Sequence, residues 1–210
     1  VVAVRAKFKN LAAPQTFGRQ YLTYVLWAIT PDGRATNLGE LLTDSGDDGK
    51  LETATELQTF ALLLTAEPYY AVTHPSDVVV MENALRGDTI GKVQTVDAKY
   101  ELLQRGRYTF DLEAANREHE RTARKVSQRE YESLTELYQA RNAVQLAAAN
   151  GAEEHSADTL ARARQQLAQA ERRYEDRPKS RDVVTLAREA TQTAEDARLI
   201  AARRAAAQRP

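Results

Sequence analysis

Four consecutive residues, His155, Ser156, Ala157 and Asp158, contain the three side-chain types of a hydrolase triad. In such a triad the serine attacks a carbonyl, the histidine takes the serine's proton, and the carboxylate orients the histidine. The three groups have to converge in space, so they normally come from distant positions in the chain. We therefore favour a helix N-terminus at this point, with Ser156 or Asp158 as its cap.

The remaining histidines and the carboxylates give no stronger indication of catalysis or metal binding. His119 lies between two glutamates, but residue 123 is alanine, whereas a helical zinc site needs a second histidine at that spacing. His74 precedes a proline, which favours a solvated or locally bonded loop histidine. The aspartates of residues 44–48 surround glycines without following the EF-hand order. The chain has no cysteine and no phosphate-binding glycine motif, so we expect a non-enzymatic protein without cofactor or metal.

Three aromatic residues are the possible contacts for a ligand or partner. Tyr69 and Tyr70 are adjacent in a β-prone run, so a regular strand would point them to opposite faces and leave one exposed. Trp27 lies in a run that is apolar on both faces, which favours core packing. A stacking surface for a carbohydrate or peptide, made by Tyr69, Tyr70 and Trp27, stays open as the alternative.

The composition divides the chain near residue 112. Eight of the nine glycines and eleven of the fourteen aromatic residues precede that point, and 23 alanines follow it. The 29 basic and 30 acidic residues leave a net charge of −1, which argues against bulk nucleic-acid binding. No apolar run approaches the roughly 18 residues that span a bilayer, so we expect no transmembrane segment.

The first part has the spacing of turn-forming residues that is typical of an antiparallel β protein. Turn-forming residues, such as the Pro-Asp-Gly of residues 31–33, separate short β-prone runs without intervening helical patterns. We predict an Ig-like β-sandwich in residues 1–90, within an α+β protein of two domains. The expected strands are residues 2–8, 21–30, 35–42, 57–66, 69–73 and 78–81.

The second part changes to helical periodicity. Apolar stripes predict helices over residues 118–150, 160–174 and 183–201, with Gly151 ending the first and Ser180 capping the third. We therefore predict an alanine-rich helical domain over residues 118–210, as an elongated antiparallel hairpin or three-helix bundle. The third helix has an almost entirely alanine seam, which could pack within the chain or against a second copy. Residues 91–117 form the expected junction, in which residues 99–108 are a short helix or a linker lying on the sandwich.

Several segments carry a resemblance to a known family. The run of residues 23–34, TYVLWAITPDGR, and the runs 37–40, 65–72, 75–80, 99–103 and 194–198 resemble the N-terminal region of bacterial OmpA-family envelope proteins, especially acidobacterial ones. The helical part, with residues 140–143 and 187–190, is similar to an alanine-rich domain of unknown function in periplasmic lipoproteins.

This resemblance implies a structural or interaction protein of the periplasm or outer membrane. Such proteins usually carry a signal peptide before the sandwich and a peptidoglycan-binding OmpA-like domain after the helices. The sequence starts without methionine or a signal peptide, so we expect it to be an excised or mature fragment. Its implied partners are another envelope protein or a cell-wall component, met through the full-length protein. The Asp and Arg with which OmpA-like domains contact diaminopimelate have no counterpart here, so the resemblance transfers no site residues.

Overall fold

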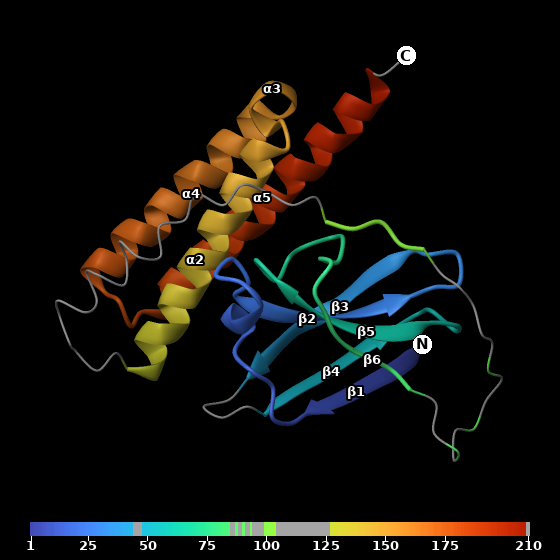
Figure 1. The fold of residues 1–210 in the computed structure, drawn as a ribbon. Helices are drawn as coiled ribbons and strands as arrows, with labels where there is room; N and C mark the ends of the chain where they lie inside the picture. Colours follow the sequence, from blue (N-terminus) through green and yellow to red (C-terminus); the bar gives the residue numbers. More distant parts are fainter. Residues whose placement is uncertain are drawn as a thin grey trace. The chain divides into compact units, whose positions relative to one another are not determined.

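The computed structural model describes residues 1–43, 48–84, 87, 90, 93, 99–103 and 127–208 (Figure 1). The protein is α+β, with a curled six-stranded antiparallel sheet followed by helices. Contacts divide the chain into two compact units, Val1–Arg105 and Gly106–Pro210, which we call the β unit and the helical unit.

The β unit contains one sheet in which neighbouring strands are all antiparallel. The strand order is β1-β4-β3-β2-β5-β6, and a short 3₁₀ helix, η1 (Pro14–Phe17), lies between β1 and β2. The strands are β1 (Val2–Phe8), β2 (Thr23–Ile29), β3 (Ala35–Thr43), β4 (Gly49–Thr55), β5 (Ala61–Glu67) and β6 (Val79–Glu82).

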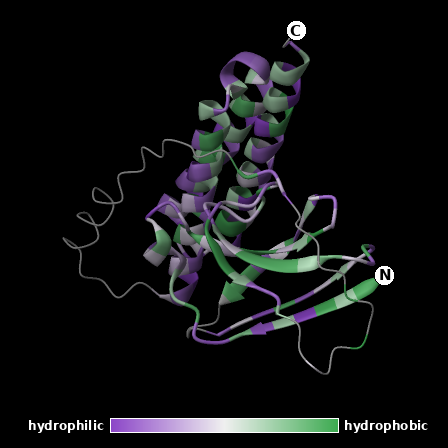
Figure 2. Cartoon of the chain, turned by 45° about the vertical axis from the view of Figure 1, so that its right-hand side comes forward, coloured by the Kyte–Doolittle hydropathy of each residue, from purple (hydrophilic) through white to green (hydrophobic). Residues whose placement is uncertain are grey.

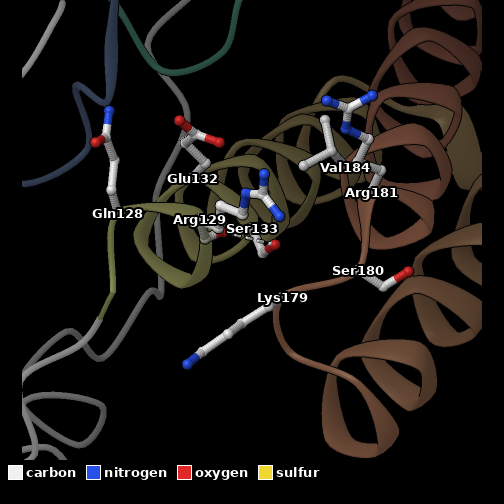
Figure 3. Close-up of a pocket in the computed structure, with 8 residues that line it drawn as sticks. All are labelled: Gln128, Arg129, Glu132, Ser133, Lys179, Ser180, Arg181 and Val184. Carbon is white, nitrogen blue, oxygen red and sulfur yellow. Dashed lines mark hydrogen bonds between the residues drawn. The ribbon is translucent and has the colours of Figure 1, made fainter.

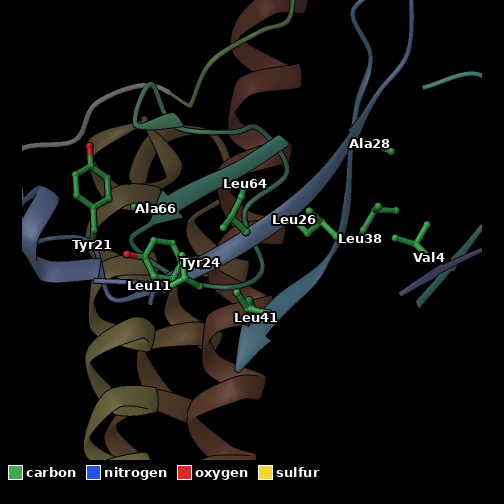
Figure 4. Packing of buried hydrophobic residues seen from close by; sticks show 10 residues of the cluster. All are labelled: Val4, Leu11, Tyr21, Tyr24, Leu26, Ala28, Leu38, Leu41, Leu64 and Ala66. Atoms are coloured by element: carbon green, nitrogen blue, oxygen red, sulfur yellow. The ribbon is translucent and has the colours of Figure 1, made fainter. Parts of the chain in front are cut away.

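Strand β2 is the centre of this unit, and every one of its residues is buried. The sequence predicted a strand covered on both faces at this position, and the structure confirms it. One face of β2 joins a cluster of ten buried residues contributed by four strands and the segments before β2 (Figure 4). The cluster consists of Val4, Leu11, Tyr21, Tyr24, Leu26, Ala28, Leu38, Leu41, Leu64 and Ala66.

Strand β3 curls the sheet by changing partner along its length. Its first part pairs with β2, and Leu42 and Thr43 pair with Lys50 and Gly49 of β4. A register shift interrupts the β2–β3 ladder opposite Gly39, whose φ of 135° lies in a region that favours glycine. Irregularities of this kind bend a strand, so β3 follows the curve around the core.

One predicted strand is wrong, and one strand of the sheet was not predicted. Strand β4 was not predicted, because Leu51 is the one large apolar residue among its seven residues. Residues 69–73 form turns instead of a strand. Their backbone is held by Asn37, whose amide donates hydrogen bonds to the carbonyls of Tyr70 (2.9 Å) and Val72 (2.8 Å).

The helical unit is built from three long helices that each contact the other two. They are α2 (Gln128–Ala149), α4 (Ala157–Asp176) and α5 (Arg181–Ala207), with the single-turn α3 (Ala152–His155) between α2 and α4. Figure 2 shows hydrophobic and hydrophilic residues interleaved along these helices. Of the predicted helix 118–150, residues 118–126 lie outside the described part of the chain.

The predicted seam of α5 is fully buried and packs within the helical unit. Its N-terminal half contacts Leu137 and Ala140 of α2 and Ala170 of α4. Alanine lets helix axes approach closely, but each residue buries little area, so stabilisation has to accumulate along the helix. The seam comprises Val183, Ala187, Ala190, Ala194, Ala197 and Ala201.

The helix ends follow the expected local chemistry. Gly151, at a φ of 83°, ends the α2 segment in the left-handed conformation, as predicted. Ser180 caps α5, since its hydroxyl accepts a hydrogen bond from the Asp182 amide (3.2 Å), also as predicted.

Beside the seam, α5 buries charged groups in ion pairs. Arg198 donates two hydrogen bonds to Glu195 (2.7 and 2.8 Å), and both side chains are almost completely buried. Arg188 pairs with Glu136 of α2. A buried charge is tolerated when it is paired. The Arg188–Glu136 pair joins α5 to α2, whereas the Arg198–Glu195 pair lies within α5.

Candidate functional site

The helical unit contains a pocket where the start of α2 lies near the turn that leads into α5 (Figure 3). Its volume is about 350 Å³. Two helix beginnings contribute to it, and helix N-termini carry a partial positive charge. The lining residues are Gln128, Arg129, Glu132 and Ser133 from α2, and Lys179, Ser180, Arg181 and Val184 from the turn and α5.

The charged groups around this pocket are mostly cationic. Arg129, Lys179 and Arg181 are exposed, and Glu132 is the single carboxylate among the lining residues. In Figure 3 Arg129 lies in the middle of the view, with Lys179 and Arg181 on either side of it. Within the described part of the chain, none of these three cations forms an ion pair. The pocket therefore presents a net positive surface to solvent.

The two helix beginnings at the pocket differ in their capping. Ser180 caps α5, whereas Ser127 occupies the N-cap position of α2 without making a capping hydrogen bond. The Ser127 hydroxyl oxygen is buried and has no hydrogen-bond partner among the described residues. The first N–H groups of α2 thus receive no side-chain cap from Ser127.

The predicted contact residues Trp27, Tyr69 and Tyr70 all belong to the β unit. Trp27 lies on β2 and Tyr69 in the turn after β5, and both have 0 % of their surface exposed. Neither offers a stacking face in this conformation. Tyr70 is half-buried, so it retains an accessible surface.

A buried carboxylate that the sequence analysis missed explains how this turn is held. Glu67 is fully buried at the end of β5, and one of its oxygens accepts hydrogen bonds from the Ser76 amide (2.7 Å) and the Thr65 hydroxyl. The same Thr65 hydroxyl accepts a hydrogen bond from the Trp27 indole (2.8 Å). The network ties β2, β5 and the turn together inside the β unit.

The residues with triad chemistry are arranged as a helix junction. Ser156 occupies the N-cap position of α4, as expected, but makes no capping bond. Its hydroxyl donates instead to the carbonyl of Ala197 on α5 (2.7 Å). A buried hydroxyl committed to a backbone carbonyl is a packing contact rather than an activated nucleophile.

The remaining histidines divide between the described and undescribed parts of the chain. His74 lies 3.2 Å from the Thr73 hydroxyl and 3.6 Å from a carboxylate oxygen of Glu101, which is the local bonding expected of a loop histidine. His119 lies outside the described residues, as do residues 44–47. Within the described ranges, no group of three or more metal-ligating side chains is found.

Two tyrosines on the helical core have perturbed ionisation. Burial raises the pKa of Tyr174, and the nearby Glu130 carboxylate raises it further. Burial also raises the pKa of Tyr138, whose ring lies 5.6 Å from the Arg141 guanidinium. Arg141 in turn pairs with Glu171 of α4 (2.7 Å).

Within the β unit, the segment 99–103 packs against residues around Gly33 and Pro75. The Leu103 amide donates to the Pro75 carbonyl (2.8 Å), and Leu103 is buried. The Lys99 carbonyl packs so closely on Gly33 that a Cβ atom there would lie 1.9 Å from it. The sequence allowed either a short helix or a linker for residues 99–108. Residues 99–103 have no helical structure, which agrees with the linker, and residues 104–108 lie outside the described part.

Comparisons of the chain with protein-family models, curated proteins and solved structures gave no match. In the described part of the chain, no helix combines the length and apolarity needed to cross a bilayer.

Proposed function

We propose that this chain is a non-enzymatic structural and interaction protein of the bacterial cell envelope. In this proposal the β unit is a docking module, and the helical unit is a spacer that precedes a peptidoglycan-binding OmpA-like domain in a longer protein. The partners are an envelope protein or a cell-wall component, and the location is the periplasm at the outer membrane. The proposal rests on the resemblance of the segments around residues 23–34 and 65–80 to OmpA-family envelope proteins.

The observation that carries the spacer role is the construction of the helical unit. Its longest helix has 27 residues, which corresponds to about 40 Å at 1.5 Å per residue. Close packing along the alanine seam and the ion pairs of Glu136 and Glu195 support a stiff element. Stiffness and length are the properties that a spacer needs.

The finer architecture is part of the same proposal. We take the curled sheet to be an Ig-like sandwich, with β3 as the strand that passes between its two layers. We keep the domain limits at residues 1–90 and 118–210, with 91–117 as the junction. The enclosed cluster around Leu26 and Leu64 supports the sandwich, because it contains residues of β1 as well as of β2, β3 and β5.

Small-angle scattering of the purified chain tests the spacer role. A compact protein of 210 residues has a radius of gyration of about 17 Å. We expect a clearly larger value and an asymmetric pair-distance distribution. A radius near the compact value would contradict the spacer role.

Binding of a carbohydrate or peptide by the β unit is the alternative function. The half-exposed Tyr70 is the one predicted contact residue whose accessibility supports it. A glycan array probed with the wild-type chain and with Tyr70→Ala tests this alternative. Loss of a specific signal in the variant would favour it, whereas no signal from either protein would count against it.

A further inference from the structure

We propose that the pocket between the start of α2 and the start of α5 binds a phosphate-bearing ligand. This site belongs to the helical unit and is independent of the docking and spacer roles proposed above. The ligand chemistry is that of a phosphate monoester or diester, carried either by a small soluble molecule or by a lipid headgroup.

The size and composition of the cavity suit such a ligand. Its volume of about 350 Å³ lies in the lower part of the range for small-molecule sites, which is about 300–1,000 Å³. It holds more than a single phosphate group, so it leaves room for the substituent of an ester. Ser133, Ser180 and Val184 are its less exposed lining residues, and the charged lining residues are exposed.

The charge of the lining determines the sign of the ligand. Three cations against one carboxylate give a net charge of +2. Outside the lining, the first turns of α2 and α5 carry Glu130 and Asp182, and Asp182 pairs with Arg173 (3.7 Å) rather than with a pocket cation. Arg129, Lys179 and Arg181 are therefore available to a ligand, and the planar guanidinium groups match phosphate oxygens in bidentate geometry.

The backbone adds a second source of positive potential. The first turns of α2 and α5 both line the pocket, and the N–H groups at a helix start have no partner within the helix. At α2 the Ser127 side chain does not take up these donors. Three cationic side chains and the start of a helix without a serine cap thus line the same pocket.

Replacement of Glu132 tests the proposal, because it should strengthen ligand binding and not weaken it. Its carboxylate lines the same pocket and would repel a phosphate. We expect Glu132→Gln to tighten binding by about threefold, because loss of a like charge near an exposed site has a modest effect. An unspecific folding defect would weaken binding instead.

The experiment is a titration of the full ¹⁵N-labelled chain with inorganic pyrophosphate, followed by amide chemical shifts. We expect saturable shifts at residues 128–130 and 180–182, and a loss of affinity of about tenfold or more in Arg129→Gln and in Arg181→Gln. Arg172→Gln is the matched control, because Arg172 is exposed on α4 outside the pocket and its replacement removes the same charge. Circular dichroism verifies that each variant is folded.

Vesicles distinguish the two sources of phosphate. Flotation with phosphatidylcholine vesicles, with and without phosphatidylglycerol, is compared between wild type and Arg129→Gln. Pyrophosphate binding without flotation assigns a soluble ligand, and flotation that needs phosphatidylglycerol and Arg129 assigns a headgroup. Absence of both, or equal weakening by Arg172→Gln, would overturn the site.

Discussion

The two units of this chain are stabilised in opposite ways. The β unit encloses large side chains, with Trp27, Tyr24, Tyr69 and Leu64 essentially without exposed surface. The helical unit packs along alanines, which bring helices close together but contribute little area each. The β unit is therefore sensitive to the loss of side-chain volume in its core, and the helical unit is sensitive to added volume along its seam.

Each unit also has its own spectroscopic probe. Trp27 is the single tryptophan of the chain and is buried in the β unit, so its fluorescence reports on that unit. Among the described residues the helices all lie in the helical unit, apart from the 3₁₀ turn η1, so far-ultraviolet circular dichroism reports mainly on that unit.

The largest expected effect is Leu64→Ala in the β core. Removing a fully buried leucine leaves a cavity and lowers the free energy of unfolding by about 2–5 kcal/mol. The denaturant midpoint of Trp27 fluorescence measures it. Leu42→Ala removes the same atoms from a residue that is 65 % exposed, and we expect a change below about 0.5 kcal/mol. Equal effects of the two variants would contradict the core assignment.

Enlarging the seam is the corresponding test of the helical unit. Ala190 is fully buried against the other helices, so Ala190→Leu forces them apart and costs about 1–3 kcal/mol. Chemical denaturation followed by circular dichroism measures the loss. The same change at Ala202, which is exposed on α5, provides the control, because leucine and alanine are both good helix formers. A seam that tolerated leucine would not be closely packed.

Helix capping gives a smaller contrast within the helical unit. Ser180→Ala removes a hydroxyl that accepts the Asp182 amide, and we expect a loss of about 1 kcal/mol in the helical transition. Ser127→Ala removes a serine in the equivalent position of α2 that makes no capping bond, so its effect should be smaller. If Ser127→Ala proved the more destabilising change, our description of these two helix starts would be wrong.

The smallest effect concerns alkaline pH. The raised pKa of Tyr174 means that folding favours its neutral form, so its contribution to stability is complete below the ordinary pKa of about 10 and is lost as the pH rises beyond it. Tyr174→Phe should therefore make stability above that pH less steeply dependent on pH. Thermal unfolding across the alkaline range measures the slope, with Tyr131→Phe, at an exposed position of α2, as the control.

The elements with strong periodicity could be predicted from the sequence. The alanine stripe of α5, the Ser180 cap and the Gly151 stop follow from local rules that apply residue by residue. Strand β2 was also predicted, because a short run that is apolar on both alternating faces is typical of a buried strand. Strand β4 was missed, since its threonines, lysine and glutamate give a weak hydrophobic alternation even though it pairs with both β1 and β3.

The features that depend on long-range contacts could not be predicted. The turn after β5 was predicted as a strand. The residues of the turn give no sign that Asn37, far earlier in the chain, donates hydrogen bonds to its carbonyls. The burial of Tyr69 follows from that turn. The cationic pocket unites two helix starts about fifty residues apart, and neither Arg129 nor Arg181 is distinctive on its own.

The native protein in its source cells provides the test of the proposal that this is an envelope protein with a spacer. Fractionation followed by mass spectrometry gives its location and intact mass. We predict a species in the envelope fraction with a mass well above the 23.4 kDa of these 210 residues, as a further wall-binding domain requires. A species of about 23.4 kDa in the cytoplasmic fraction would contradict the claim.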